Sequence, residues 1–212
     1  MTKLITLTTL ASLTLGTAAF ADPAETSKVI THPSQGDKTV VEGATARLVR
    51  HDTGIFASFE TKGLTPGHAH TIWFVVINEP AKCETPNACT SKDVLKRSDI
   101  VKSDVTGGAG VVVGEDGTAS FTWHQSEGDI ADGWFVDGLV EADHAEIHLV
   151  INDHGPLLEG REAAMLSTYR EGCAEDTIPG PMPATARASG SEGPNTCRLL
   201  QVAIFPAPAQ AS

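Results

Sequence analysis

Short segments in which apolar and polar residues alternate recur along the chain, and this two-residue period constrains the fold most. In "TASFTWH", residues 118–124, Ala119, Phe121 and Trp123 alternate with polar side chains, and "AEIHLVIND", residues 145–153, repeats the pattern. Such alternation places the apolar side chains on one face of a half-buried β-strand. No segment carries a long 3.6-residue period, and the best helix candidate, 159–169, is short. The sequence therefore predicts an all-β fold.

Turn residues between the segments indicate how the strands connect. Further strands are predicted at 45–51, 55–61, 68–78, 109–113 and 198–205. The first two flank Asp52-Thr53-Gly54, which predicts a hairpin, and the strands at 109–113 and 118–124 flank "GEDG", which predicts a second one. Many short strands separated by Gly, Pro and Asp turns are typical of an antiparallel Greek-key β-sandwich. Two runs, 79–104 and 153–196, are too long for hairpin loops and are expected to be long excursions.

The ends of the chain differ in composition from its middle. Residues 1–21 combine Lys3, an apolar stretch and the small-residue end Ala19-Phe20-Ala21, which is the pattern of a secretory signal peptide. We expect a flexible polar segment at 22–38, a single β-sandwich domain at 39–206 and a flexible tail at 207–212. No later segment reaches the roughly 20 apolar residues of a membrane span. The expected location is the periplasm or the extracellular medium.

Four cysteines support this location. An even number of cysteines in an exported chain favours disulfides over free thiols. The pairing that constrains the chain least joins cysteines that are close in sequence. Each disulfide would then cross-link one of the two long excursions. A zinc site built from all four cysteines is the alternative, although no C-x-x-C pair is present. The predicted disulfides are Cys83–Cys89 and Cys173–Cys197.

The charge of the chain limits its partners. Asp and Glu number 27 and Lys and Arg 15, so the net charge is -12. Nucleic acid is not an expected partner, because phosphate binding requires clusters of Lys and Arg. A metal cation is compatible with this charge, whereas the sequence identifies no protein partner. The same negative charge can also simply keep an exported protein soluble.

Histidines form the candidate metal site. His68 and His70 are two residues apart at the start of a predicted strand, so both side chains point to one face and can offer two imidazoles to one ion. Further histidines end a strand near residue 124 and recur in "DHAEIHLVINDHGP", residues 143–156. The predicted ligands of a copper or zinc ion are His68, His70, His124, His148 and His154. The alternative is that these histidines only form hydrogen bonds on polar strand faces.

Three stretches resemble a known group of proteins. "GLTPGHAHTIWFVVINEPAKC", "AEIHLVINDHGP" and "GPNTCRLLQVAIF" are similar to a family of uncharacterised exported bacterial proteins with a two-sheet β architecture. The similarity runs from about residue 40 to 206 and implies a β-sandwich, but no activity.

A fainter, partial likeness is to Cu/Zn superoxide dismutase. Residues 63–67, "GLTPG", followed by His68-Ala69-His70 and then Cys83, look similar to the turn, the H-x-H copper ligands and a disulfide cysteine of that family. The chain departs from the family because no histidine occurs between residues 71 and 123. The likeness implies a copper-only site completed by His124, His148 or His154.

No catalytic motif accompanies these features. The sequence has no G-x-S-x-G elbow, phosphate-binding glycine loop or helical H-E-x-x-H. We therefore expect an exported, noncatalytic β-sandwich that binds an unidentified ligand or associates with the cell envelope. The alternative is a periplasmic copper- or zinc-binding protein, including a superoxide dismutase-like one.

Overall fold

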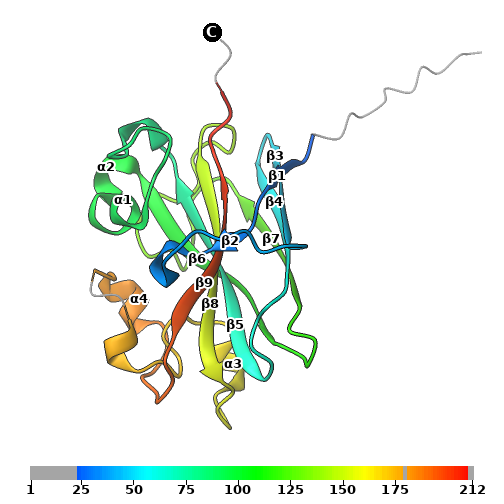
Figure 1. The fold of residues 1–212 in the computed structure, drawn as a ribbon. Helices are drawn as coiled ribbons and strands as arrows, with labels where there is room; N and C mark the ends of the chain where they lie inside the picture. The colour runs from blue at the N-terminus through cyan, green and yellow to red at the C-terminus, as the bar shows by residue number, and fades with distance from the viewer. Residues whose placement is uncertain (1–22, 179–180, 210–212) are drawn as a thin grey trace, which may run out of the picture.

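Two antiparallel sheets face each other in the computed structural model, which describes residues 23–178 and 181–209. The four-stranded sheet has the order β1-β3-β4-β7 and the five-stranded sheet the order β2-β9-β8-β5-β6. The predicted antiparallel β-sandwich is thus confirmed (Figure 1). The strands are β1 (Glu25–Ser27), β2 (Ile30–Thr31), β3 (Thr45–His51), β4 (Gly54–Thr61), β5 (His68–Ile77), β6 (Ser103–Val112), β7 (Ala119–Ser126), β8 (Glu146–Pro156) and β9 (Arg198–Phe205).

The main core lies between the two sheets and follows the predicted alternation. Phe59 of β4, Phe74 of β5 and Leu149 of β8 are all at most 1% exposed and belong to one buried cluster. The hairpin of β3 and β4 forms around Asp52 and Thr53 as predicted. Apolar burial of this kind provides about 25 cal/mol for each Å² removed from water, so this layer stabilises the sandwich.

Strand β5 is buried on both faces, as its almost continuous apolar sequence suggests. It pairs with β6 on one side and β8 on the other. Phe74 and Val76 point into the sandwich, whereas Trp73, Val75 and Ile77 point to the outer face of the five-stranded sheet. His70 has the same parity as Phe74, so its side chain lies on the inner side, at the end of the core.

The second predicted hairpin is wrong. β6 pairs with β5, and β7 pairs with β4, so the turn at residues 113–118 carries the chain from one sheet to the other. The alternating pattern correctly predicts which face of each strand is buried. It does not specify the partner, because two strands joined by a tight turn can pair within a sheet or pack across the edge of a sandwich.

The N-terminal segment also differs from its prediction as a flexible region. Within residues 22–38, β1 pairs with β3 and β2 pairs with β9, and the short 3-10 helix η1 (Pro33–Gln35) follows. One stretch of chain therefore contributes an edge strand to both sheets. Its polar composition is that of edge strands with one face in water. The predicted signal peptide, 1–21, lies outside the described residues.

The two long excursions, 78–102 and 157–197, cover the outer face of the five-stranded sheet (Figure 1). They pack on Trp73, Val75 and Ile77 to form a second buried cluster. Both predicted disulfides, Cys83–Cys89 and Cys173–Cys197, are present. The excursions contain η2 (Pro80–Lys82), α1 (Ser91–Lys96), α2 (Ser98–Val101), α3 (Glu162–Met165), η3 (Glu175–Thr177) and α4 (Ala184–Ala188).

Short helices are the only helices in the described part of the chain. Among residues 23–178 and 181–209, no helix has the length and apolar character needed to cross a bilayer. The predicted helix at 159–169 is reduced to the single turn of α3, and α1, α2 and α4 had no periodic signal because each is only four to six residues long.

Candidate functional site

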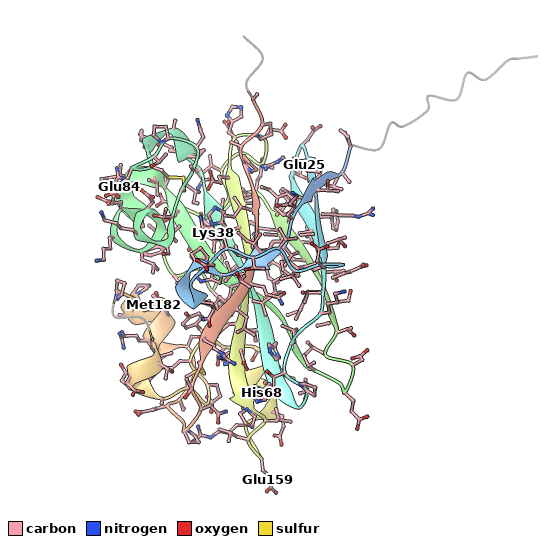
Figure 2. All side chains as sticks on the ribbon, in the orientation of Figure 1. Glu25, Lys38, His68, Glu84, Glu159 and Met182 are labelled. Carbon is pink, nitrogen blue, oxygen red and sulfur yellow. A yellow bond between two sulfur atoms is a disulfide. The ribbon has the colours of Figure 1, made fainter. Side chains whose placement is uncertain are left out.

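A pocket of about 420 Å³ lies on the outer face of the five-stranded sheet. Its floor includes Trp73 and Val150, and its walls come from the two excursions, from η1 and from the loop between β7 and β8, which carries Trp134. Figure 2 shows Lys38 and Met182, two of the lining residues, on this side of the molecule. A volume in this range is typical of sites for small molecules, which are mostly apolar with a few polar groups.

Three aromatic side chains form the most apolar part of the pocket. The ring centroids of Trp73 and Trp134 are 5.3 Å apart, and Tyr169 stands edge-on to both at 5.0 and 4.8 Å. The indole Nε1 of Trp73 donates to Thr71 Oγ1 at 2.8 Å, which satisfies its hydrogen-bonding group away from the cavity. Burial raises the pKa of Tyr169 far above its usual value, so the phenol stays neutral. These rings offer a rigid apolar surface.

The polar end of the pocket contains two histidines. His148 Nε2 lies 2.6 Å from Glu146 Oε1, which also accepts a hydrogen bond from the backbone amide of Cys89. The second oxygen, Glu146 Oε2, is buried without a hydrogen-bond partner among the described residues. The second histidine, His32, accepts a hydrogen bond at Nδ1 from the backbone amide of Ser34 at 3.2 Å. Burial, with a smaller effect of His148, lowers the pKa of His32 to about 4, so this imidazole is uncharged at neutral pH.

A second cluster lies at the rim of the sandwich, where β5 begins. His68 Nδ1 is 2.9 Å from Asp153 Oδ1, and His70 Nε2 is 3.8 Å from the same oxygen. A β-bulge brings this carboxylate to both histidines: His68 is opposite Pro156 and His70 is opposite Asp153, so β8 has one residue more than β5 in this interval. Bulges commonly redirect side chains in this way. Figure 2 shows His68 at the end of the molecule distant from Glu84.

The inner imidazole of this cluster has an unused nitrogen. His70 is fully buried, its Nδ1 lies 3.3 Å from the carbonyl oxygen of His68, and its Nε2 has no hydrogen-bond partner among the described residues. Burial lowers the pKa of His70, and the nearby Asp153 carboxylate opposes this effect. Arg198 Nε lies 3.7 Å from Asp153 Oδ2 and partly balances the charge of the carboxylate.

The other three predicted ligands lie elsewhere. His124 stacks on His51 with centroids 5.9 Å apart, on the four-stranded sheet. His148 lines the pocket, and His154 faces the outer side of the five-stranded sheet, where its Nε2 is 2.8 Å from Thr71 Oγ1. Burial lowers the pKa of His154 to about 4. The structure therefore does not bring the five histidines into one centre.

One group in the described part of the chain has three potential ligand atoms within 4.8 Å of one another: His154, Cys173 and Cys197. Both sulfur atoms belong to a disulfide, and metal ligation requires thiolates. This group therefore serves the packing of the second excursion rather than ligation.

The bulge at Asp153 depends on Gly155, and replacing Gly155 with Ala is expected to destabilise the protein by about 2 kcal/mol. Gly155 has φ +79°, and an added Cβ would lie 2.8 Å from Cβ of Asn195. Asn195 cannot easily move, since its Nδ2 donates to the carbonyl oxygens of His154 and Pro156. Urea unfolding followed by fluorescence would measure the change.

Gly160 provides the matched control for that experiment. It has φ +77°, but nothing lies within 4 Å of its added Cβ, so Gly160→Ala adds only backbone strain of about 1 kcal/mol. Equal effects of the two alanines would show that the contact with Asn195 does not constrain the bulge.

Sequence reasoning missed the pocket and Asp153 as a partner of the histidines. The chain has three Trp and one Tyr. Two of these tryptophans and the tyrosine meet in the pocket although they lie on segments around residues 73, 134 and 169. They lie on β5, on the loop between β7 and β8 and on the second excursion, so no local sequence pattern connects them.

Comparison with known protein families, curated proteins and solved structures finds no match to this chain.

Proposed function

We propose that the chain is an exported, noncatalytic binding protein that holds a small, largely apolar molecule in the pocket over the five-stranded sheet. The observation that carries the proposal is the pocket itself, about 420 Å³, with Trp73, Trp134 and Tyr169 as its apolar surface. A ligand in this pocket would bury apolar area against rings that are already ordered, so it would lose little affinity to side-chain ordering.

A second hollow, of about 430 Å³, supports the proposal less well. It lies over the four-stranded sheet and is lined by residues such as Phe56, which is 54% exposed, and His124. In the first pocket, by contrast, Trp73, Trp134 and Tyr169 are at most 7% exposed. An enclosed site removes more of a small ligand from water and therefore binds it more tightly.

The polar groups favour binding over catalysis. Nucleophilic catalysis by a hydroxyl or thiol requires that group within hydrogen-bond reach of an activating base. Within the described residues, the side chain of His148 forms a hydrogen bond only with Glu146, and both nearby cysteines of the first excursion are in a disulfide. Ser34 Oγ lies 2.8 Å from His32 Nδ1, but the pKa of His32 is lowered to about 4, so this imidazole is too weak a base to activate the hydroxyl. His148 and His32 are therefore assigned to orienting a polar group of the ligand. Two disulfides agree with an oxidising, extracytoplasmic environment.

The proposal predicts that the protein binds the neutral apolar dye N-phenyl-1-naphthylamine with one site per chain, and that Leu95→Trp weakens binding at least about tenfold, or 1.4 kcal/mol. Leu95 of α1 lines the pocket and is only partly buried, so the larger indole can enter the cavity. Dye fluorescence excited through Trp73 and Trp134 would report binding.

The matched control is Leu157→Trp, the same substitution at a leucine that is 36% exposed and is not part of the pocket. It should leave dye binding unchanged. A wild-type protein that does not bind the dye saturably would refute the proposed function, as would equal binding by Leu95→Trp and the wild type.

A further inference from the structure

We propose that His68, His70 and Asp153 form a binding site for a divalent transition-metal ion, zinc or copper, at the rim of the sandwich. The site is separate from the apolar pocket and goes beyond the binding role proposed above. It keeps His68 and His70 from the sequence prediction, but it replaces the other three histidines with a carboxylate.

The donor set suits such an ion. Two imidazoles and one carboxylate are common ligands of zinc and copper, and a three-residue set leaves one coordination position for water or another small ligand. Two ligand atoms on one tetrahedral zinc, each about 2 Å from the ion, lie roughly 3.3 Å apart. Asp153 Oδ1 is 2.9 Å from His68 Nδ1 and 3.8 Å from His70 Nε2, so its distances to the two nitrogens bracket this value.

The buried nitrogen of His70 gives the independent reason to infer a ligand. Polar atoms in protein interiors almost always have a partner, because an unsatisfied one costs about 1–3 kcal/mol. His70 Nε2 is fully buried, points toward the carboxylate and has no hydrogen bond in the described part of the chain. A metal ion between this nitrogen and Asp153 would satisfy both groups.

Completion of the site needs a movement of His68 only. The three ligand atoms do not yet all lie within 4.8 Å of one another, and the two imidazole centroids are 6.3 Å apart. The side chain of His68 is 22% exposed, whereas those of His70 and Asp153 are at most 1% exposed. Asp153 is held by the amide of Gly155 at 2.8 Å. Two ligands are thus fixed by the fold, and the exposed third can close over the ion.

Arg198 is expected to compete with the metal ion for Asp153. Its Nε lies 3.7 Å from Asp153 Oδ2, and its side chain is 50% exposed. Without a metal, the guanidinium partly neutralises the buried carboxylate. With a metal, two positive charges would compete for Asp153, so Arg198 would turn toward solvent. Removing this guanidinium should therefore strengthen metal binding, an effect that a purely structural ion pair would not produce.

Titration of the untagged, metal-free protein with Zn²⁺ by calorimetry tests the proposal. The wild type should bind one equivalent, His68→Ala should weaken binding at least about tenfold, and Arg198→Ala should tighten it. His68→Ala removes a half-buried rim side chain, so it leaves the core intact if the more disruptive His70→Ala does not fold. Co²⁺ in place of Zn²⁺ should give the visible absorption of a tetrahedral site, and His68→Ala should abolish it.

His144→Ala is the matched control for zinc binding by surface histidines. His144 is about half exposed and pairs with Glu141 at 2.6 Å, so it also offers an imidazole beside a carboxylate. It should leave the titration unchanged. The proposal is overturned by a wild type that binds no zinc, by unchanged binding in His68→Ala, by weaker binding in Arg198→Ala, or by a loss of binding in His144→Ala.

Discussion

Leu149→Asp is expected to prevent folding. Leu149 of β8 is 1% exposed, and its side chain points between the two sheets. An unpaired buried carboxylate costs several kcal/mol, and losing the packing of the leucine costs about 2–5 kcal/mol more. Together these losses are comparable with the roughly 5–15 kcal/mol by which whole domains are stable. The variant should lack a cooperative thermal transition and a β-type circular dichroism spectrum.

Two substitutions separate the effect of the charge from that of its position. Leu149→Met keeps the volume and should cost less than about 1.5 kcal/mol. Val136→Asp places the same charge at a residue that is 90% exposed and should leave the melting temperature unchanged. A folded Leu149→Asp protein with nearly wild-type stability would contradict the assignment of β8 to the centre of the core.

Replacing Cys173 and Cys197 together with Ala should lower stability by roughly 3 kcal/mol. The two cysteines are 24 residues apart, and opening a loop of this length restores that much entropy to the unfolded chain. For a domain of this size, the melting temperature would fall by about 10 °C. Dye binding should weaken too, since Tyr169 and Met182 line the pocket from the same excursion. Differential scanning calorimetry and dye titration measure the two effects.

The first disulfide provides the comparison. Cys83 and Cys89 are 6 residues apart, so their replacement with Ala should cost less, roughly 2 kcal/mol. If the Cys173–Cys197 variant melts like the wild type and binds the dye equally well, the excursion does not depend on its disulfide.

The strands and their buried faces could be predicted because the two-residue period reports burial directly. β3 and β9 have the predicted bounds, and His68 and His70 share a face as their spacing requires. The proximity of Asp153 could not be predicted, because it depends on a bulge that shifts the register between β5 and β8. A local pattern contains no information about the register of a distant strand.

The pocket could not be predicted from the sequence for a related reason. Its lining residues come from η1, α1, the five-stranded sheet, the loop that carries Trp134 and the second excursion, and no local pattern connects segments so far apart in sequence. The disulfide pairs, in contrast, were correctly predicted, because both connect cysteines that are close in sequence.

The segment that contains β1 and β2 places a short strand at one edge of each sheet. An unpaired edge strand exposes a row of backbone donors and acceptors to which another chain can add. β1 has three residues and β2 has two, and they partly cover β3 and β9, which have seven and eight. Short strands are poor templates for such addition. The opposite edges are formed by the longer strands β7 and β6. A chain shortened to begin after Thr31 would therefore present a long edge strand on both sides of each sheet, and copies of it could join edge to edge into open-ended assemblies.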